Sequence, residues 1–111
     1  MSKATDIQVS AVKLFFLEAP MRVPLKFGGE TISSCSVARV NLQVTGRDGK
    51  STWGWGESVL SPGWAWPAPC SFAERDGFMK AFCEKLAGEW SRFEYTGHPM
   101  EIGHEFLQTR L

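Results

Sequence analysis

Residues 36–45 carry the pattern that most restricts the fold, because apolar and polar side chains alternate along them. A period of two places successive side chains on opposite faces of a strand, so one face is expected in the core and the other in water. The apolar positions are Val40, Leu42 and Val44. The Asp48-Gly49 pair that follows supplies positive-φ residues for a tight turn. Residues 51–58 are therefore predicted to return as an antiparallel strand.

Residues 7–17 show the same alternation and are predicted to form the first strand, which becomes continuously apolar toward its end. Residues 19–34 are predicted to form a long loop, since Pro20 and Pro24 have no backbone donor and no alternation is assigned there. Residues 59–70 contain three further prolines and are predicted to be a second irregular segment.

The second half of the chain is predicted to be helical. Ser71 and Glu74 have the spacing of a capping box, and a helix is predicted from there to about Tyr95. Gly97 is the predicted stop, and Pro99 suits the first position of a last helix. The long helix is expected to bury a stripe of residues three or four apart, namely Phe78, Phe82, Leu86, Trp90 and Phe93.

Strands followed by helices predict an α+β fold, in which a three-stranded antiparallel meander packs against helices. The last helix reaches Leu111 without a stop signal. Residues 1–111 are therefore predicted to be one domain cut from a longer chain.

Charge and cysteine content exclude several classes of protein. Twelve basic residues balance twelve acidic ones without a basic block, which argues against nucleic-acid and anionic-membrane partners. The polar start and the lack of a long apolar run predict a cytoplasmic protein. An odd number of cysteines without metal-ligand spacing is interpreted as reduced, partly buried thiols, at Cys35, Cys70 and Cys83.

The sequence predicts no catalytic residue and no metal ligand. Glu57 lacks the partner that acid–base chemistry requires. Glu101-x-x-His104 is half of a helical di-metal motif, and a solvent-facing helix side explains it better. Trp53 and Trp55 are interpreted as packing residues, because large aromatic side chains dominate small cores.

The two irregular segments contain the candidate substrate-binding residues. Arg22 and Lys26 could face a substrate carboxylate, and the alternative is that they are solvated loop charges. Phe27, Trp64 and Trp66 could contact a substrate or a neighbouring domain, and the alternative is local packing.

Four motifs are similar, in order and spacing, to the capping domain of the enolase superfamily, of the mandelate racemase and muconate lactonizing enzyme type. The segment after the family's first strand resembles VPLKFG at 23–28, and its second strand resembles VNLQVT at 40–45. Its Gly-x-Gly-Glu strand resembles GWGES at 54–58. The helix that leads toward its barrel begins with a segment similar to HPMEI at 98–102.

The resemblance implies a complete enzyme with a C-terminal (β/α)7β barrel, which this chain lacks. In that family, acidic residues of the barrel hold Mg²⁺, and lysine or histidine bases remove the proton next to a carboxylate. The reaction would be that of a racemase, epimerase, dehydratase or cycloisomerase. Residues 21–29 and 59–69 would be the capping loops, which exclude water and shape the pocket for a small carboxylate. The chain alone would be inactive.

A second hypothesis is a stand-alone binding module. It rests on Trp64-Ala65-Trp66-Pro67, because tryptophan faces stack on sugars and grip proline-rich peptides.

Overall fold

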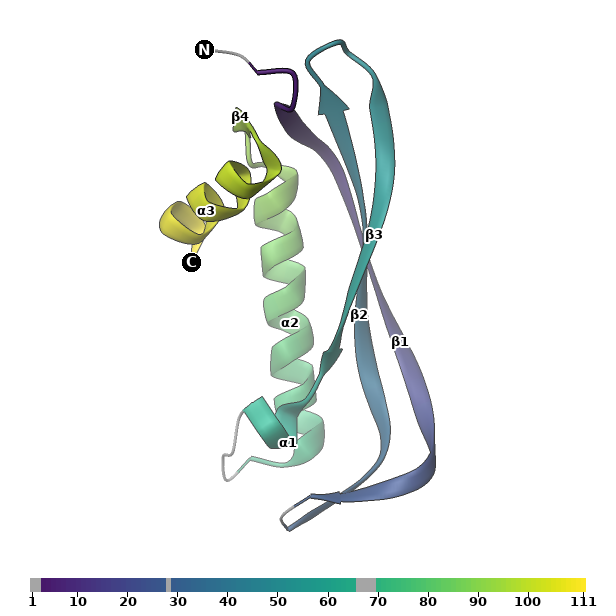
Figure 1. Ribbon diagram of the computed structural model, residues 1–111. Helices are drawn as coiled ribbons and strands as arrows, with labels where there is room; N and C mark the ends of the chain where they lie inside the picture. The colour runs from purple at the N-terminus through teal and green to yellow at the C-terminus, as the bar shows by residue number, and fades with distance from the viewer. Residues whose placement is uncertain (1–2, 28, 66–69) are drawn as a thin grey trace. The chain divides into compact units, whose positions relative to one another are not determined.

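The computed structural model describes residues 3–27, 29–65 and 70–111, which form an α+β fold (Figure 1). The strands are β1 (Ile7–Phe27), β2 (Glu30–Gly46), β3 (Ser51–Leu60) and β4 (Thr96–Gly97). The helices are α1 (Pro62–Ala65), α2 (Phe72–Ser91) and α3 (Pro99–Arg110). The strand order is β3-β2-β1-β4, so the α+β prediction is confirmed and the short β4 joins the three predicted strands.

Contacts divide the chain into two compact units. Unit 1 comprises Met1–Lys13, Asn41–Trp55 and Leu86–Leu111. Unit 2 comprises Leu14–Val40 and Gly56–Lys85. In the described part of the chain no helix is long and apolar enough to cross a membrane.

The turn between β2 and β3 forms as the sequence predicts, with one difference. The amide of Gly49 donates to the carbonyl of Gly46 at 3.0 Å, and the amide of Gly46 donates to the carbonyl of Lys50 at 2.8 Å. Gly49 alone among the described residues has a positive φ, of 82°. Asp48 instead accepts the amide of Lys50 on its side chain at 3.0 Å, so it supports the turn without entering the left-handed region.

The prediction of a loop over residues 19–34 is wrong, because β1 continues to Phe27 and β2 begins at Glu30. Pro20 and Pro24 are four residues apart, so their missing donors fall on the same edge of β1. The described β4 pairs with β1 only at Ile7 and Gln8, which leaves that edge without a paired strand farther along. An edge strand tolerates proline where its N–H would face away from the sheet.

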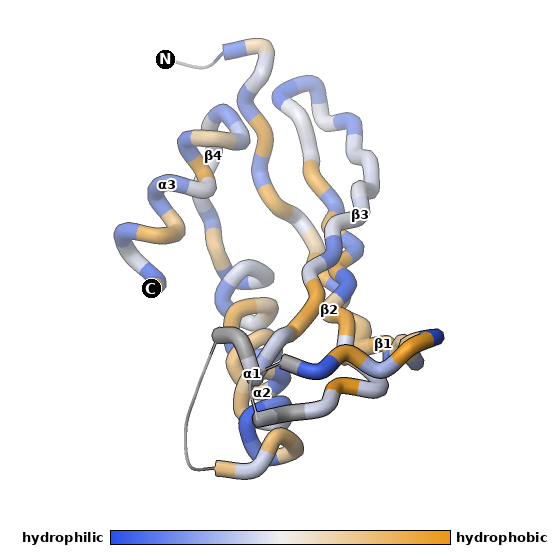
Figure 2. The backbone as a smooth tube through the Cα atoms, turned by 60° about the horizontal axis from the view of Figure 1, so that its bottom comes forward, coloured by the Kyte–Doolittle hydropathy of each residue, from blue (hydrophilic) through white to orange (hydrophobic). Residues whose placement is uncertain are grey.

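The same stretch alternates after all. Apolar residues occupy the odd positions of β1, with Ala19, Met21, Val23 and Leu25 in succession. The even positions hold prolines and charged residues, with Glu18, Pro20, Arg22, Pro24 and Lys26. Figure 2 shows hydrophobic and hydrophilic segments alternating along β1. This period of two is the strand signal that the prolines concealed.

The prediction for residues 59–70 is also wrong at its start. β3 extends through Leu60, which is 6% exposed, and the fully buried Pro62 opens α1. Proline fits there because the first helical residue needs no amide donor. The rest of this segment, residues 66–69, lies outside the described residues.

Helix α2 begins as predicted and ends early. The amide of Glu74 donates to the Ser71 hydroxyl at 3.1 Å, which caps the helix at its start. Its last turn tightens through a hydrogen bond from the Arg92 amide to the Glu89 carbonyl at 3.2 Å, and Ser91 is its final residue. Gly97 is not the stop, because it belongs to β4.

The predicted buried stripe of α2 is only half correct. Phe78 and Phe82 are 51% and 50% exposed, whereas Leu86 and Trp90 pack against the core of unit 1. That core consists of Phe93, Ile102 and Phe106. The rings of Trp90 and Phe106 stack with their centroids 3.9 Å apart, and Phe93 meets Phe106 edge-on at 5.3 Å. These aromatic contacts fix α3 within unit 1.

Trp53 and Trp55 do not pack in a core, contrary to the prediction. They are 41% and 64% exposed, and the Lys13 ammonium lies 4.8 Å from the ring centroid of Trp53. A cation above an indole face is a favourable contact at a surface.

Candidate functional site

The exposed end of β1 carries the two basic candidates, Arg22 and Lys26. Both occupy even positions of the strand, so their side chains leave the same face, roughly 13 Å apart along a strand that rises about 3.3 Å per residue. Neither makes a hydrogen bond or an ion pair with another described residue. The structure therefore brings these two cations together as an uncompensated basic pair on one strand face.

The three aromatic candidates are not brought together by the described structure. Phe27 is the last residue of β1 and Trp64 lies in α1, but their side chains are outside the described part. Trp66 lies outside it altogether. Their predicted contacts with a substrate remain predictions.

A polar network that sequence reasoning missed joins β1 and β2 to α2 in unit 2. The Ser36 hydroxyl donates to Glu18 at 2.6 Å and to Asp76 at 3.1 Å. The Lys80 ammonium bridges the same two carboxylates, at 3.1 Å from Glu18 and 3.0 Å from Asp76. This network ties the strand that carries Arg22 to the helix behind it.

The charges in the network stabilise one another. The Ser36 hydroxyl and then the Lys80 ammonium lower the pKa of the Glu18 carboxyl. Asp76 and then Glu18 raise the pKa of the Lys80 ammonium. Opposite charges in hydrogen-bond contact favour both ionised forms, so the network is held as an ion pair at neutral pH. The i,i+4 spacing of Asp76 and Lys80 was the sequence signal available for half of it.

Arg75 is a second residue that the sequence analysis missed. It is buried, with 4% of its surface exposed. Its Nη1 donates to the carbonyl of Pro62 at 3.3 Å and its Nε donates to the carbonyl of Ser71 at 3.4 Å. A guanidinium presents several donors in a rigid fork, so one side chain can hold the starts of α1 and α2 together. Arg75 thereby fixes the root of the segment that carries Trp64.

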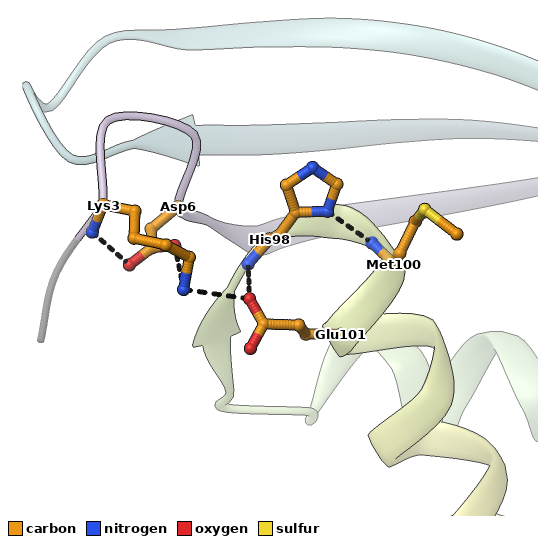
Figure 3. Close-up of polar contacts among 5 residues, drawn as sticks. All are labelled: Lys3, Asp6, His98, Met100 and Glu101. Atoms are coloured by element: carbon orange, nitrogen blue, oxygen red, sulfur yellow. Dashed lines mark hydrogen bonds and ion pairs between the residues drawn. The ribbon is translucent and has the colours of Figure 1, made fainter.

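In unit 1 a charged cluster fixes the N-terminal segment to α3 (Figure 3). The Asp6 carboxylate accepts the Lys3 amide at 2.7 Å, and the Lys3 ammonium lies 3.0 Å from Glu101. Glu101 also accepts the His98 amide at 3.1 Å, while His98 Nδ1 accepts the Met100 amide at 3.1 Å. Glu101 therefore serves as a helix cap and an ion-pair partner, which agrees with a structural role for this residue.

The pKa shifts in this cluster follow from those contacts. The Lys3 amide lowers the pKa of Asp6, and the Lys3 ammonium lowers the pKa of Glu101, with help from the His98 amide. Glu101 and Asp6 raise the pKa of Lys3 in return. A cavity of about 240 Å³ lies beside the cluster and is lined by Ala4, Asp6, Ile7, Gly46, Arg47 and Asp48. Its lining carries both signs of charge.

The cysteines are half-buried thiols, as predicted, at Cys35, Cys70 and Cys83. Burial, and then the charge of Glu84, raises the pKa of the Cys83 thiol. A raised pKa makes the thiolate scarce, so Cys83 is poorly suited to nucleophilic chemistry. Among the described residues no group of three or more His, Cys, Asp or Glu side chains could hold a metal ion.

Comparisons with protein-family models, with curated proteins and with solved structures found no match to this chain.

Proposed function

We propose that this chain is the capping domain of a metal-dependent enzyme of the enolase superfamily, which removes a proton next to a carboxylate. The supporting observation is that the four motifs lie in order on the elements where a capping domain would carry them. Residues 23–28 lie around the end of β1, 40–45 in β2, 54–58 in β3 and 98–102 at the start of α3.

In this proposal the substrate carboxylate is attracted by Arg22 and Lys26. Both side chains are exposed and lack a carboxylate partner among the described residues, so a ligand anion would complete their charge pairing. They share a strand face whose root is fixed by the Glu18–Lys80 ion pair. A fixed root limits the conformational freedom that is lost when substrate binds.

The bond-breaking step belongs to the barrel in this proposal. Mg²⁺ bound there would stabilise the enediolate form of the substrate. The described residues of this chain offer no group of three metal-ligating side chains, so they do not fit that ion and no step is assigned to them. What these residues contribute is binding, orientation and the exclusion of water.

The stand-alone binding module gains no support from the described residues. It depends on Trp64 and Trp66, whose side chains lie outside them.

Steady-state kinetics of the complete enzyme test the capping role. Arg22→Ala and Lys26→Ala should each lower kcat/KM for the carboxylate substrate by about 1–3 kcal/mol in transition-state binding, mainly through KM. Mg²⁺ affinity should not change. Lys50→Ala is the matched control, because Lys50 is an exposed cation in the β2–β3 turn, away from this strand face. Unchanged kinetics in both variants, or an equal loss in the control, would contradict the proposed contact.

A further inference from the structure

The sheet in unit 2 has a covered face and an open face. The covered face consists of even-numbered residues, since Ser36 donates to Asp76 of α2 and the Lys80 ammonium lies 5.8 Å from the Phe16 ring centroid. The pleat turns odd-numbered residues the opposite way. We call that side the outer face, and its large apolar side chains are Phe15, Leu17, Met21, Val23, Leu25 and Val59.

The outer face is unusually apolar for a surface. Val23 is 75% exposed, Val59 54% and Leu25 49%. Together the six side chains expose roughly 500 Å², near the upper end of the patches of about 300–600 Å² that are the largest on typical monomers. Patches of that size are often binding sites, and the energy gained by covering one is proportional to its apolar area.

We propose that a second copy of this chain covers the outer face, in a two-fold symmetric dimer that packs the β1 strands face to face. Two such faces together bury about 1,000 Å², the size at which specific protein–protein interfaces begin. A two-fold interface places the same patch on both sides, so the patch must be complementary to itself. An apolar face meets this condition without any charge to neutralise.

The charges around the outer face also suit a symmetric pair. The odd positions of β1 from Phe15 to Leu25 carry no charged residue. On the same face, Arg39 of β2 and Glu57 of β3 form an ion pair at 2.8 Å. The face therefore presents both signs, and in a two-fold dimer Arg39 of one copy can meet Glu57 of the other without like-charge repulsion.

Two other occupants fit the outer face less well. An extended peptide that adds to the edge of β1 would meet Pro20 and Pro24, which lack the donors that strand pairing needs. An anionic membrane would be bound by basic residues beside the apolar ones, but Arg22 and Lys26 leave the opposite face of β1. The proposal does not depend on the capping role, because it involves neither substrate nor Mg²⁺.

Sedimentation velocity of the 111-residue chain between about 1 and 200 µM tests the dimer. The expected result is a monomer–dimer equilibrium with no larger species. Val23→Glu places a charge at the most exposed apolar position, so it should raise the dimer dissociation constant at least tenfold without changing the circular dichroism spectrum. Arg22→Glu changes the neighbouring residue on the opposite face and should leave the dissociation constant within about twofold.

Charge exchange provides the second arm of the test. Arg39→Glu and Glu57→Arg should each weaken the dimer, and the double variant should restore it, because the pairing of signs between copies is then recovered. A chain that stays monomeric at 200 µM would overturn the proposal. So would a dimer that Val23→Glu leaves intact, an open-ended series of larger species, or a monomer that floats with vesicles of phosphatidylcholine and phosphatidylglycerol.

Discussion

Arg75 shows how a single side chain can fix a long connection. A buried guanidinium is costly unless its donors are paired, and here it holds the carbonyls of Pro62 and Ser71. Those carbonyls belong to the starts of α1 and α2, so the side chain replaces hydrogen bonds that the irregular backbone between them cannot make. The residue is therefore expected to matter for stability more than its position near a helix start suggests.

Arg75→Ala should lower the free energy of unfolding by about 1–3 kcal/mol, because two buried carbonyls lose charged donors. Arg75→Lys should recover only part of the loss, since one ammonium cannot reproduce the fork. Urea unfolding measures both. Arg92→Ala is the control, because the Arg92 side chain is 68% exposed and pairs with Glu89 at the surface, so its cost should stay below about 0.5 kcal/mol. Equal losses at Arg75 and Arg92 would show that the buried contacts contribute little.

Among the elements, the β2–β3 turn depends on one backbone conformation. Gly49 has a φ of 82°, and a Cβ added there would meet nothing within 4 Å. Gly49→Ala should therefore cost about 1 kcal/mol through backbone strain alone. Gly54→Ala is the control, because Gly54 also has open space around it but no positive φ. Thermal unfolding should show a lower Tm for the first variant and no loss for the second. A loss of the same size in both would mean that the effect does not come from the turn.

The link between β1 and α2 should depend on acid. The pKa of Glu18 lies below its ordinary value of 4.5, so its ionised form is favoured in the folded state. This stabilisation is fully present above the unfolded pKa and is lost as the pH falls from about 4.5 through the lowered pKa. Glu18→Gln should be less stable than the wild type at pH 7, and the difference should shrink as the pH falls toward 3. A difference that stayed constant from pH 7 to pH 3 would contradict this account. Urea unfolding at each pH gives the comparison.

Elements whose signals are local could be predicted from the sequence. The turn after β2 follows from Asp48-Gly49, and α3 begins at Pro99 behind its His98 cap, as expected. The extension of β1 was missed because Pro20 and Pro24 normally break strands, and only the position of β1 at a sheet edge makes them acceptable. Trp53 and Trp55 were misplaced because composition gives no information about which face of a strand a neighbour covers.

For the whole molecule, the candidate site is known less completely than the fold. Arg22 and Lys26 could be singled out from the sequence, and the structure adds that they share one strand face. The network of Glu18, Ser36 and Lys80 could not be found in the same way, because its members are 18 and 62 residues apart from one another along the chain. Only tertiary structure brings such residues together.

The most direct test of the central claim, that this chain caps a catalytic barrel, is to sequence the gene beyond the codon for Leu111. The account predicts that the natural reading frame continues into a (β/α)7β barrel with a Lys-x-Lys motif and acidic residues at the strand ends, the groups that would supply the bases and the Mg²⁺ ligands. A natural stop codon directly after Leu111, or a continuation without those residues, would contradict it.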